Sequence, residues 1–449
     1  MKGQDIRHLD EARDRLITGL KGGWKKLNVK RILIIEDAFG RFSLGVWGPQ
    51  SSMNSLKKIM MGIAPFDSGS IFSPPVSPGD FDPLELESSW EEALSIVEDD
   101  EVEWDERLRI TVRHRMLPAW QRITKEPLWR LDGDGICPVV AFYSFKGGMG
   151  RTTALSLFAV SRALQNEHVV VVDLDLDAPG LGSILASTNA PPYGVVDYLI
   201  ETPILGERPK DLLDYSWNVD LGANRTTGSL RVFPAGNLDR NYLGKMARLD
   251  FEAEPYIEGV RRHPVEELLL HIHEKLRPDW ILVDSRTGFS ETAGMVLSGL
   301  CNFHVLFGVD SNQSWEGIGY AVRKLGAERL SRNLPQAEVM MVHAMVPELS
   351  KNSAKEDLLE HFSDRSQEVF ADGYFAQDEE NRDEDFWYLN DEMGNSSPYH
   401  PWPLPYRPSL AQSVAIEDLV DELNGSKEYS TFCIALAARA RGGNAEEAL

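Results

Sequence analysis

From residue 137 onward, short apolar runs alternate with segments whose apolar residues recur at helical spacing. Runs that are apolar on both faces are typical of strands buried in a parallel sheet. They occupy residues 139–144, 168–172, 230–233, 280–283, 303–309 and 339–342, and helical spacing marks residues 151–165, 265–276 and 291–300. This alternation predicts a doubly wound, mostly parallel α/β sheet.

The first 132 residues have a different pattern. Residues 5–20 place leucines and an alanine at helical spacing, and residues 31–35 and 42–47 resemble a strand pair around a short loop. We therefore expect a small α+β module at residues 1–132, of no evident task, and the main α/β domain at residues 133–449. Between residues 351 and 392, 14 acidic residues stand against 4 basic ones, which indicates an acidic insertion at about residues 348–398.

A glycine-rich string joins the first strand of the main domain to its first helix. Glycines let backbone N–H groups converge on an anion, and the N-terminus of the following helix adds partial positive charge. The hydroxyl of Thr152 is placed to bind Mg²⁺, and that of Thr153 is placed to reach an α-phosphate. The string predicts a nucleotide-phosphate site, and it reads Lys146-Gly147-Gly148-Met149-Gly150-Arg151-Thr152-Thr153.

Two further apolar runs end in carboxylates. Residues 169–172 continue into Asp173, Asp175 and Asp177, and residues 280–283 continue into Asp284. Ligands of open α/β sheets bind at the carboxyl ends of the strands. An apolar strand that ends in Asp is also the form that holds Mg²⁺ beside nucleotide phosphates. We therefore expect Asp284 to bind the metal together with the hydroxyl that opens the first helix.

The phosphate loop departs from the ordinary P-loop in two places. Phe145 stands at the expected first glycine and is followed at once by Lys146, and Arg151 replaces the usual P-loop lysine. With this early lysine, the loop resembles that of the deviant Walker A family of the SIMIBI class, which includes the ParA, MinD, Mrp and Get-type ATPases. The string Asp-Leu-Asp-x-x-Ala-Pro-Gly-Leu at residues 173–181 and Asp-Ser-Arg-Thr-Gly at residues 284–288 resemble one bacterial branch of that family.

The resemblance implies an ATPase that requires ATP and Mg²⁺ and dimerises on ATP. It implies that Lys146 crosses the dimer interface to the partner's nucleotide, that Asp175 orients the attacking water, and that Gly288 belongs to a loop sensing the γ-phosphate. Asp177 either shares the role of Asp175 or helps to hold the metal. Arg286 either contacts phosphate or the second subunit, or faces solvent.

A late segment resembles the part of these ATPases that forms the pocket for the nucleotide base. It contains Pro405 and Tyr406, which we expect to contact the base. The guanine-reading motif Asn-Lys-x-Asp does not follow residues 339–342, which favours adenine. Arg151 keeps a positive charge but is bulkier than lysine. A scaffold that binds nucleotide with little or no turnover therefore stays open beside the ATPase.

The charge balance bears on the partners. The chain has 46 Lys and Arg against 70 Asp and Glu, a formal net charge of −24, which disfavours direct binding to nucleic acid or to anionic membranes. The N-terminus has no signal-peptide pattern and no apolar run is long enough to span a bilayer, so a cytoplasmic location is expected. The three cysteines form no CxxC pair, which argues against an iron–sulfur carrier.

The C-terminal residues argue against two functions that occur within the family. A membrane-bound MinD type would end in a basic amphipathic helix, whereas this chain ends in Glu446-Glu447-Ala448-Leu449. A bacterial tyrosine kinase of the same fold would carry a tyrosine cluster there, and only Tyr429 is near. The resemblance instead implies a dimerising switch that regulates an effector protein encoded nearby, in a bacterial defence or stress-response system.

Overall fold

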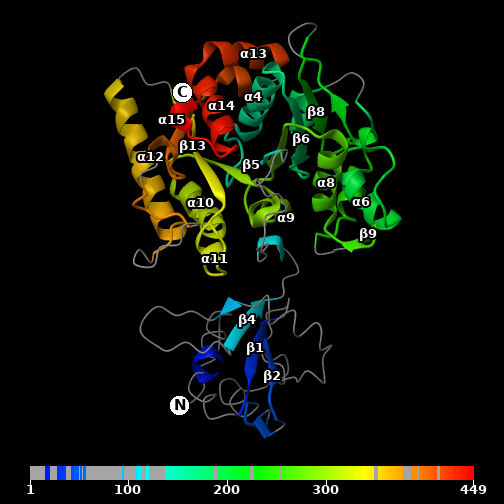
Figure 1. Ribbon diagram of the computed structural model, residues 1–449, viewed down its shortest axis with the longest axis vertical. Helices are drawn as coiled ribbons and strands as arrows, with labels where there is room; N and C mark the ends of the chain where they lie inside the picture. Colours follow the sequence, from blue (N-terminus) through cyan, green and yellow to red (C-terminus); the bar gives the residue numbers. More distant parts are fainter. Residues whose placement is uncertain are drawn as a thin grey trace. The chain divides into compact units, whose positions relative to one another are not determined.

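The computed structural model describes residues 16–20, 28–36, 42–49, 51–52, 54–56, 94–95, 108–112, 118–120, 137–186, 190–222, 227–251, 255–347, 352–377, 386–391, 394–411 and 415–448. The chain divides into two units, Met1–Met116 and Leu117–Leu449 (Figure 1). The sequence analysis expects the domain boundary at residue 132, and Pro118–Trp120, a single turn of 3₁₀ helix labelled η2, packs within the second unit.

The first unit contains a four-stranded sheet in the order β2-β1-β4-β3. The predicted strand pair is confirmed, since β1 (Arg31–Glu36) and β2 (Phe42–Trp47) pair antiparallel with Arg31 opposite Trp47. β1 also pairs parallel with β4 (Leu108–Val112), which in turn pairs antiparallel with β3 (Leu94–Ser95). Of the helix predicted at residues 5–20, residues 16–20 are helical and the remainder lies outside the described residues.

The described residues of the second unit form an eight-stranded sheet in the order β14-β13-β12-β5-β11-β6-β8-β7. Neighbouring strands run parallel except for β7 and β8. The predicted doubly wound, mostly parallel sheet is thus confirmed, and every predicted run coincides with a strand, with the run at 303–309 extending one residue past the end of β12. The strands are β5 (Val139–Ser144), β6 (His168–Leu174), β7 (Trp217–Asn218), β8 (Ser229–Phe233), β11 (Trp280–Ser285), β12 (Phe303–Gly308), β13 (Glu338–Val346) and β14 (Pro401–Pro405).

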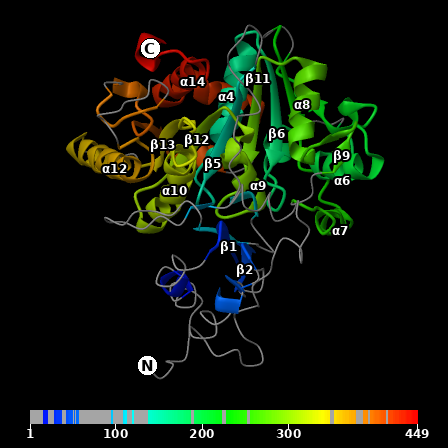
Figure 2. The same cartoon turned by 60° about the horizontal axis from the view of Figure 1, so that its bottom comes forward.

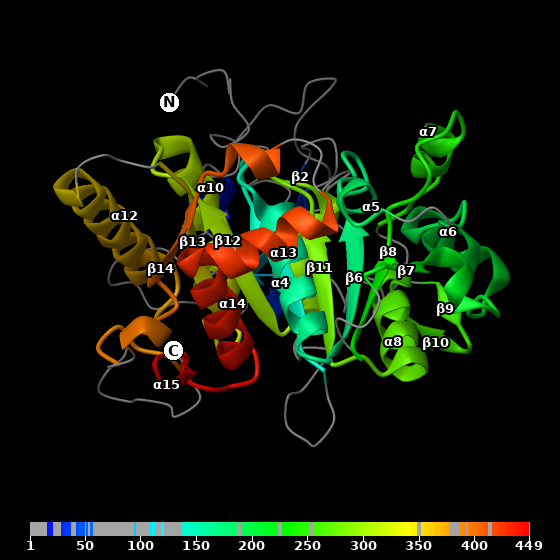
Figure 3. The same cartoon turned by 90° about the horizontal axis from the view of Figure 1, so that it is seen from above.

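Helices cover both faces of this sheet, as Figure 3 shows for the face under α4, α13 and α14. The 151–165 and 265–276 helices occur as predicted, and the 291–300 helix occurs as α9 followed by a π-helical turn, η4 (Val296–Leu300). The helices are α4 (Arg151–Leu164), α5 (Leu181–Ile184), α6 (Val195–Leu205), α7 (Tyr242–Met246), α8 (Pro264–Leu276), α9 (Glu291–Met295), α10 (Asn312–Leu325), α11 (Ala327–Leu330), α12 (Asn352–Gly373), α13 (Ile416–Gly425), α14 (Lys427–Arg439) and α15 (Ala445–Ala448). A small hairpin joins β9 (Tyr256–Ile257) to β10 (Val260–Arg261).

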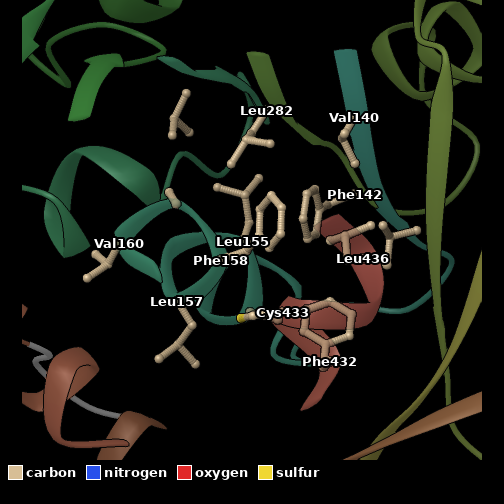
Figure 4. Packing of buried hydrophobic residues seen from close by; sticks show 14 of the residues in the cluster. Val140, Phe142, Leu155, Leu157, Phe158, Val160, Leu282, Phe432, Cys433 and Leu436 are labelled. Carbon is tan, nitrogen blue, oxygen red and sulfur yellow. The ribbon is translucent and has the colours of Figure 1, made fainter. Parts of the chain in front are cut away.

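The alternation of side chains along β5 separates two cores. Val140 and Phe142 pack with α4 and α14, and the Phe142 and Phe158 rings lie 6.4 Å apart between centroids (Figure 4). Val139 and Ala141 point to the other face, where they pack with the apolar side of α6 and α8. Both faces of β5 are therefore buried, as the uninterrupted apolar run predicts. This burial fixes the strand from which the phosphate loop departs.

The acidic segment expected as an insertion at residues 348–398 contains an ordered helix. α12 lies beside α10 (Figure 2), and its Phe362 and Phe370 are fully buried in the core that α10 also lines. Trp315 of α10 and Phe362 have ring centroids 4.6 Å apart. The acidic side chains of α12 thus occupy the remaining face of an amphipathic helix. Residues 348–351, 378–385 and 392–393 of the segment lie outside the described residues.

Within the described residues, no helix combines the length and the apolar character needed to cross a membrane. Cys137, Cys301 and Cys433 are free and buried, as expected for small apolar side chains.

Candidate functional site

The phosphate loop between β5 and α4 depends on two glycines in the left-handed region. Gly148 has φ +75° and Gly150 has φ +74°, a conformation that side chains bearing a Cβ disfavour. A Cβ built at either glycine, or at Gly147, meets no described atom within 4 Å, so the loop borders open space. Ala154 N donates to Gly150 O at 2.9 Å and begins α4. The loop therefore presents a helix N-terminus to a space where an anion fits.

Arg151, the first residue of α4, turns its side chain inward to two carboxylates. Its Nε lies 2.6 Å from Asp284 Oδ1, and its Nη2 lies 2.9 Å from Asp175 Oδ2. All three residues are buried. Burial lowers the pKa of Arg151, but the charges of Asp284 and Asp175 outweigh it and raise that pKa above its ordinary value. The guanidinium is therefore held charged as the bridge between the ends of β6 and β11.

The hydroxyl of Thr152 donates to Asp284 Oδ2 at 2.8 Å. A hydroxyl and a carboxylate at this separation are the protein oxygens that Mg²⁺ takes beside nucleotide phosphates. The described residues contain no group of three or more His, Cys, Asp or Glu side chains able to hold a metal by themselves. Thr152 and Asp284 thus fit a metal that is completed by phosphate oxygens and water.

Strand register explains why these residues meet. Asp284 of β11 is opposite Phe142 of β5 on one side and opposite Asp173 of β6 on the other. Asp173 accepts hydrogen bonds from Asp175 N at 3.0 Å and from Leu181 N at 3.3 Å, which fixes the turn after β6. Burial and the charges of Asp284 and Asp175 raise the pKa of Asp173 well above its ordinary value. Asp173 thus positions the turn that carries Asp175. The sequence alone did not show which of Asp173, Asp175 and Asp177 has this role.

Two buried polar atoms at this edge lack partners. Arg151 Nη1 and Asp175 Oδ1 have no hydrogen-bond partner among the described residues, although both atoms are buried. Buried polar atoms in folded proteins are nearly always paired, so each exception calls for a reason. A phosphate oxygen would satisfy the first atom, and a bound water would satisfy the second.

The loop after β11 returns over the phosphate loop. Gly288, with φ +65°, donates its N–H to Ser144 O at 3.3 Å and accepts from Tyr143 Oη at 3.3 Å. Arg286 forms an ion pair with Asp177, and both side chains are partly exposed. The sequence did not predict this pair, which ties the loop after β11 to the turn after β6.

A pocket of about 320 Å³ adjoins the phosphate loop and holds the residues expected at the base. Tyr429 Oη donates to Pro405 O at 3.3 Å, which ties α14 to the end of β14. Met345 and Tyr429 also line this pocket and were not predicted from the sequence. Met345 lies near the end of β13 and Tyr429 lies in α14, and neither residue type marks a nucleotide pocket by itself. The lining residues are Gly148, Met149, Gly150, Thr153, Ile184, Met345, Leu404, Pro405, Tyr406, Arg407, Leu410 and Tyr429.

Lys146 is partly buried at the start of the phosphate loop, and its carbonyl accepts from Ser144 Oγ at 2.9 Å. In the described part of the chain its ammonium group forms no ion pair. The structure thus brings together every sequence-predicted site residue at one sheet edge, with Arg151, Thr152, Asp175 and Asp284 in direct contact and Pro405 and Tyr406 across the neighbouring pocket.

No family model and no curated protein matches this sequence. Solved structures similar to it include a ParA family ATPase from Chlorobium tepidum TLS, with 17% identity and a TM-score of 0.42 over 66% of this chain and 96% of that one. MinD of Pyrococcus horikoshii OT3, complexed with Mg-ADP, has 15% identity and a TM-score of 0.41 over 68% and 98%. The pNOB8 ParA bound to nonspecific DNA has 13% identity and a TM-score of 0.40 over 70% and 100%.

These proteins are ATPases of the ParA and MinD type, the type that the motifs of this chain resemble. In this chain, the glycine loop, Arg151, Thr152 and Asp284 lie together at one edge of a doubly wound α/β sheet.

Proposed function

We propose that this chain is an ATP- and Mg²⁺-dependent switch that dimerises on ATP and controls a partner protein. The proposal is carried by one observation: the glycine loop, Arg151, Thr152 and Asp284 converge at the carboxyl end of a parallel sheet, beside a pocket of about 320 Å³. An open edge of this kind is where α/β sheets bind nucleotides.

Different residues of the site would contact different parts of the nucleotide. The N–H groups of the glycine loop would hold the phosphates, Thr152 and Asp284 would hold Mg²⁺, and Thr153 would reach the α-phosphate. Pro405 and Tyr406 would line the space for adenine. A bound Mg²⁺ supplies charge that offsets the negative charge of the phosphates. The orphaned Arg151 Nη1 supports this assignment, because it is a buried positive donor with room for one more acceptor.

Asp175 would orient the attacking water. Its Oδ1 lacks a partner among the described residues, and its Oδ2 is held by Arg151, so the carboxylate is fixed with one oxygen left for water. A carboxylate fixed in this way positions a nucleophile without needing to move, which is how positioning lowers the barrier of a reaction. Lys146 would act on the nucleotide of the second subunit.

The partner is expected to be a protein. With a formal net charge of −24, most of the surface repels phosphate backbones and anionic lipid. We propose a cytoplasmic effector encoded nearby, within a bacterial defence or stress-response system. Since the pNOB8 ParA has been solved with DNA, a DNA-binding assay in the presence of ATP belongs with the tests. Tight binding to random duplex DNA at physiological salt would show that the partner is DNA and not a protein.

A second function is favoured by one specific contact. Because Arg151 engages Asp175 and Asp284 together, the nucleotide site can hold ATP while the water-orienting carboxylate stays locked. The chain would then be a nucleotide-binding scaffold with little turnover. Mixing excess protein with radiolabelled ATP and Mg²⁺ separates the two functions: a single turnover that releases phosphate supports the switch, whereas ATP that stays bound and intact supports the scaffold. Absence of ATP binding would eliminate both.

A further inference from the structure

The Pro118–Trp120 segment is bonded to the region that follows the γ-phosphate loop. Trp120 Nε1 donates to Ser290 O at 2.7 Å, and Ala119 N donates to the Glu291 carboxylate at 3.3 Å. Ser298 Oγ lies 2.7 Å from Ala119 O. These contacts join residues that are 170 or more positions apart in sequence. The segment is therefore anchored through Ala119 and Trp120 to the start of α9 and to η4.

A buried lysine completes the anchor. Lys324 of α10 donates from Nζ to Trp120 O at 2.9 Å, and its side chain is 1% exposed. Burial lowers the pKa of Lys324 to about 8. Placing an ammonium group in such surroundings is unfavourable unless acceptors meet it. α10 thus carries a polar group whose position suits the backbone of the docked segment.

The ring of Trp120 belongs to an aromatic cluster that reaches the phosphate loop. Its centroid lies 5.1 Å from that of Phe289, in edge-to-face geometry, and Phe289 lies 5.2 Å from Phe145 in the same type of contact. Phe289 directly follows Gly288, and Phe145 directly precedes Lys146. Trp120 also contacts Tyr143 of β5 at 6.4 Å. One cluster therefore joins the start of the phosphate loop, the loop after β11 and the docked segment.

The fit around this segment is specific. A Cβ added at Gly294 of α9 would lie 2.7 Å from Trp120 Cδ1 and 2.8 Å from Trp120 N. A Cβ at Gly317 of α10 would fall within 2.3 Å of three atoms of the Phe145 ring. Both helices thus carry glycine where an aromatic residue of the cluster presses against them. Glycine inside a helix is destabilising relative to alanine, so close packing accounts for its presence.

We propose that Trp120 is a positioning residue for the nucleotide-sensing loop, and that it acts on that loop through the ring of Phe289. A shift of Gly288 on ATP binding moves Phe289, and Trp120 follows because it is packed against that ring. This inference rests on the proposed function.

Gly294→Ala provides the sharpest test because it inserts one methyl group beneath Trp120. Gly319→Ala is the matched control: it also replaces a helical glycine, but the nearest described atom to its added Cβ is Val369 Cγ1 at 4.0 Å. Alanine favours both helices by propensity, so an effect confined to Gly294→Ala comes from the close contact with Trp120 and Ala119. We expect Gly294→Ala to bind ATP within about twofold of wild type and to change single-turnover hydrolysis by about tenfold, with Gly319→Ala like wild type.

Tryptophan emission tests the same coupling independently of turnover. We expect a difference in emission between the ATP and ADP states of the wild type, and we expect Trp120→Phe to abolish it while leaving ATP affinity unchanged. Trp387→Phe is the control, since the backbone of Trp387 bonds Ala376 and Gln336 and not the loop after β11. An emission difference that survives Trp120→Phe would overturn the proposal.

The outcomes distinguish failure of the proposed function from failure of the role of Trp120. If wild type binds no ATP, the proposed function and this inference fall together. If wild type binds and hydrolyses ATP while Gly294→Ala folds and matches it in turnover, only the role of Trp120 is refuted. Should Gly294→Ala fail to fold, as seen by circular dichroism, the emission of Trp120→Phe decides.

Discussion

Arg151 and Asp284 form a buried ion pair in which Nε and Oδ1 are 2.6 Å apart, although the sequence assigns one to the phosphates and the other to the metal. The same guanidinium reaches Asp175, so a single side chain holds both carboxylates. The forked shape of arginine suits this arrangement, because Nε and Nη2 each meet one carboxylate and Nη1 is left without a partner among the described residues.

Arg151→Lys should slow turnover. Lysine keeps the positive charge for phosphate but offers its three N–H donors from one nitrogen, whereas Arg151 reaches Asp284 and Asp175 from two. Because Asp175 is then held less firmly, we expect ATP affinity to be retained and single-turnover hydrolysis to fall by roughly tenfold, which corresponds to about 1.4 kcal/mol in the barrier. Arg162→Lys, at the far end of the same helix, is the control. Unchanged hydrolysis would show that Arg151 does not position Asp175, and faster hydrolysis would support the nucleotide-binding scaffold in which Arg151 locks that carboxylate.

Thr152→Ala should weaken ATP binding only when Mg²⁺ is present. The substitution removes the hydroxyl that lies 2.8 Å from Asp284 and leaves the glycine loop intact. We expect a loss of about tenfold or more in affinity by calorimetry, and no further loss on adding EDTA. Ser156→Ala removes a neighbouring hydroxyl that bonds Thr152 O and serves as the control. If the affinity of Thr152→Ala equals that of wild type with and without EDTA, Thr152 is not a metal ligand.

Asp175→Asn should leave ATP bound and stop turnover. The amide keeps the size of the side chain but loses the negative charge that orients and activates water, a change that commonly costs about 10²–10⁴-fold in rate. Asp177→Asn is the matched control, because its carboxylate pairs with Arg286 in a partly exposed position. Hydrolysis at the wild-type rate in Asp175→Asn would move the water-orienting role elsewhere, and loss in Asp177→Asn alone would move it to Asp177.

The strands and the phosphate loop were predictable because their signals are local. The runs at β5, β6 and β11 are apolar on both faces, and the glycines of the loop stand at fixed spacing after β5. β14 was not predictable as a strand, because three of its five residues are proline. Proline lacks the N–H of the ladder and is confined to sheet edges, and β14 is an edge strand.

The contacts within the site depend on order in space, which the sequence does not carry. Nothing local indicates that β11 lies between β5 and β6, and that order is what places Asp284 beside Arg151 and opposite Asp173. Trp120 is likewise separated by 170 residues from Ser290, its hydrogen-bond partner. Its role appears only when the chain is folded, since one tryptophan among ordinary residues has no distinguishing pattern.

Lys324 should give stability a specific pH dependence. Burial lowers its pKa from 10.5 to about 8, so between these values the unfolded chain binds a proton that the folded chain does not. The free energy of unfolding contributed by this group therefore rises with pH across that window, by up to about 3 kcal/mol, and the cost of the buried charge is fully present below it.

The measurement compares Lys324→Met with wild type by urea unfolding at about pH 7 and about pH 10. Wild type should gain stability relative to Lys324→Met as pH rises, because the variant has no amine to neutralise. Lys355→Met, which removes a partly exposed lysine paired with Glu428, should keep the wild-type pH dependence. Parallel pH profiles for wild type and Lys324→Met would mean that Lys324 titrates near its ordinary value in the folded chain.

Lys146→Ala tests whether the chain is a dimerising switch. Arg151 already occupies the place of the P-loop cation, and in the described part of the chain the Lys146 ammonium group forms no ion pair. A second subunit would give it phosphates to contact. Charge-assisted contacts to phosphate are strong in a site closed off from water, so they would link nucleotide binding to association.

We expect wild type to shift toward a dimer on adding ATP and Mg²⁺, and Lys146→Ala to bind ATP yet keep its nucleotide-free mass in light scattering at matched concentration. Lys210→Ala, which removes an exposed lysine, should dimerise like wild type. The comparison isolates Lys146 because its loss leaves the glycine loop, Thr152 and Asp284 in place to hold nucleotide. If wild type and Lys146→Ala have the same mass with and without ATP, the lysine does not act across subunits, and the nucleotide-binding scaffold becomes the better description.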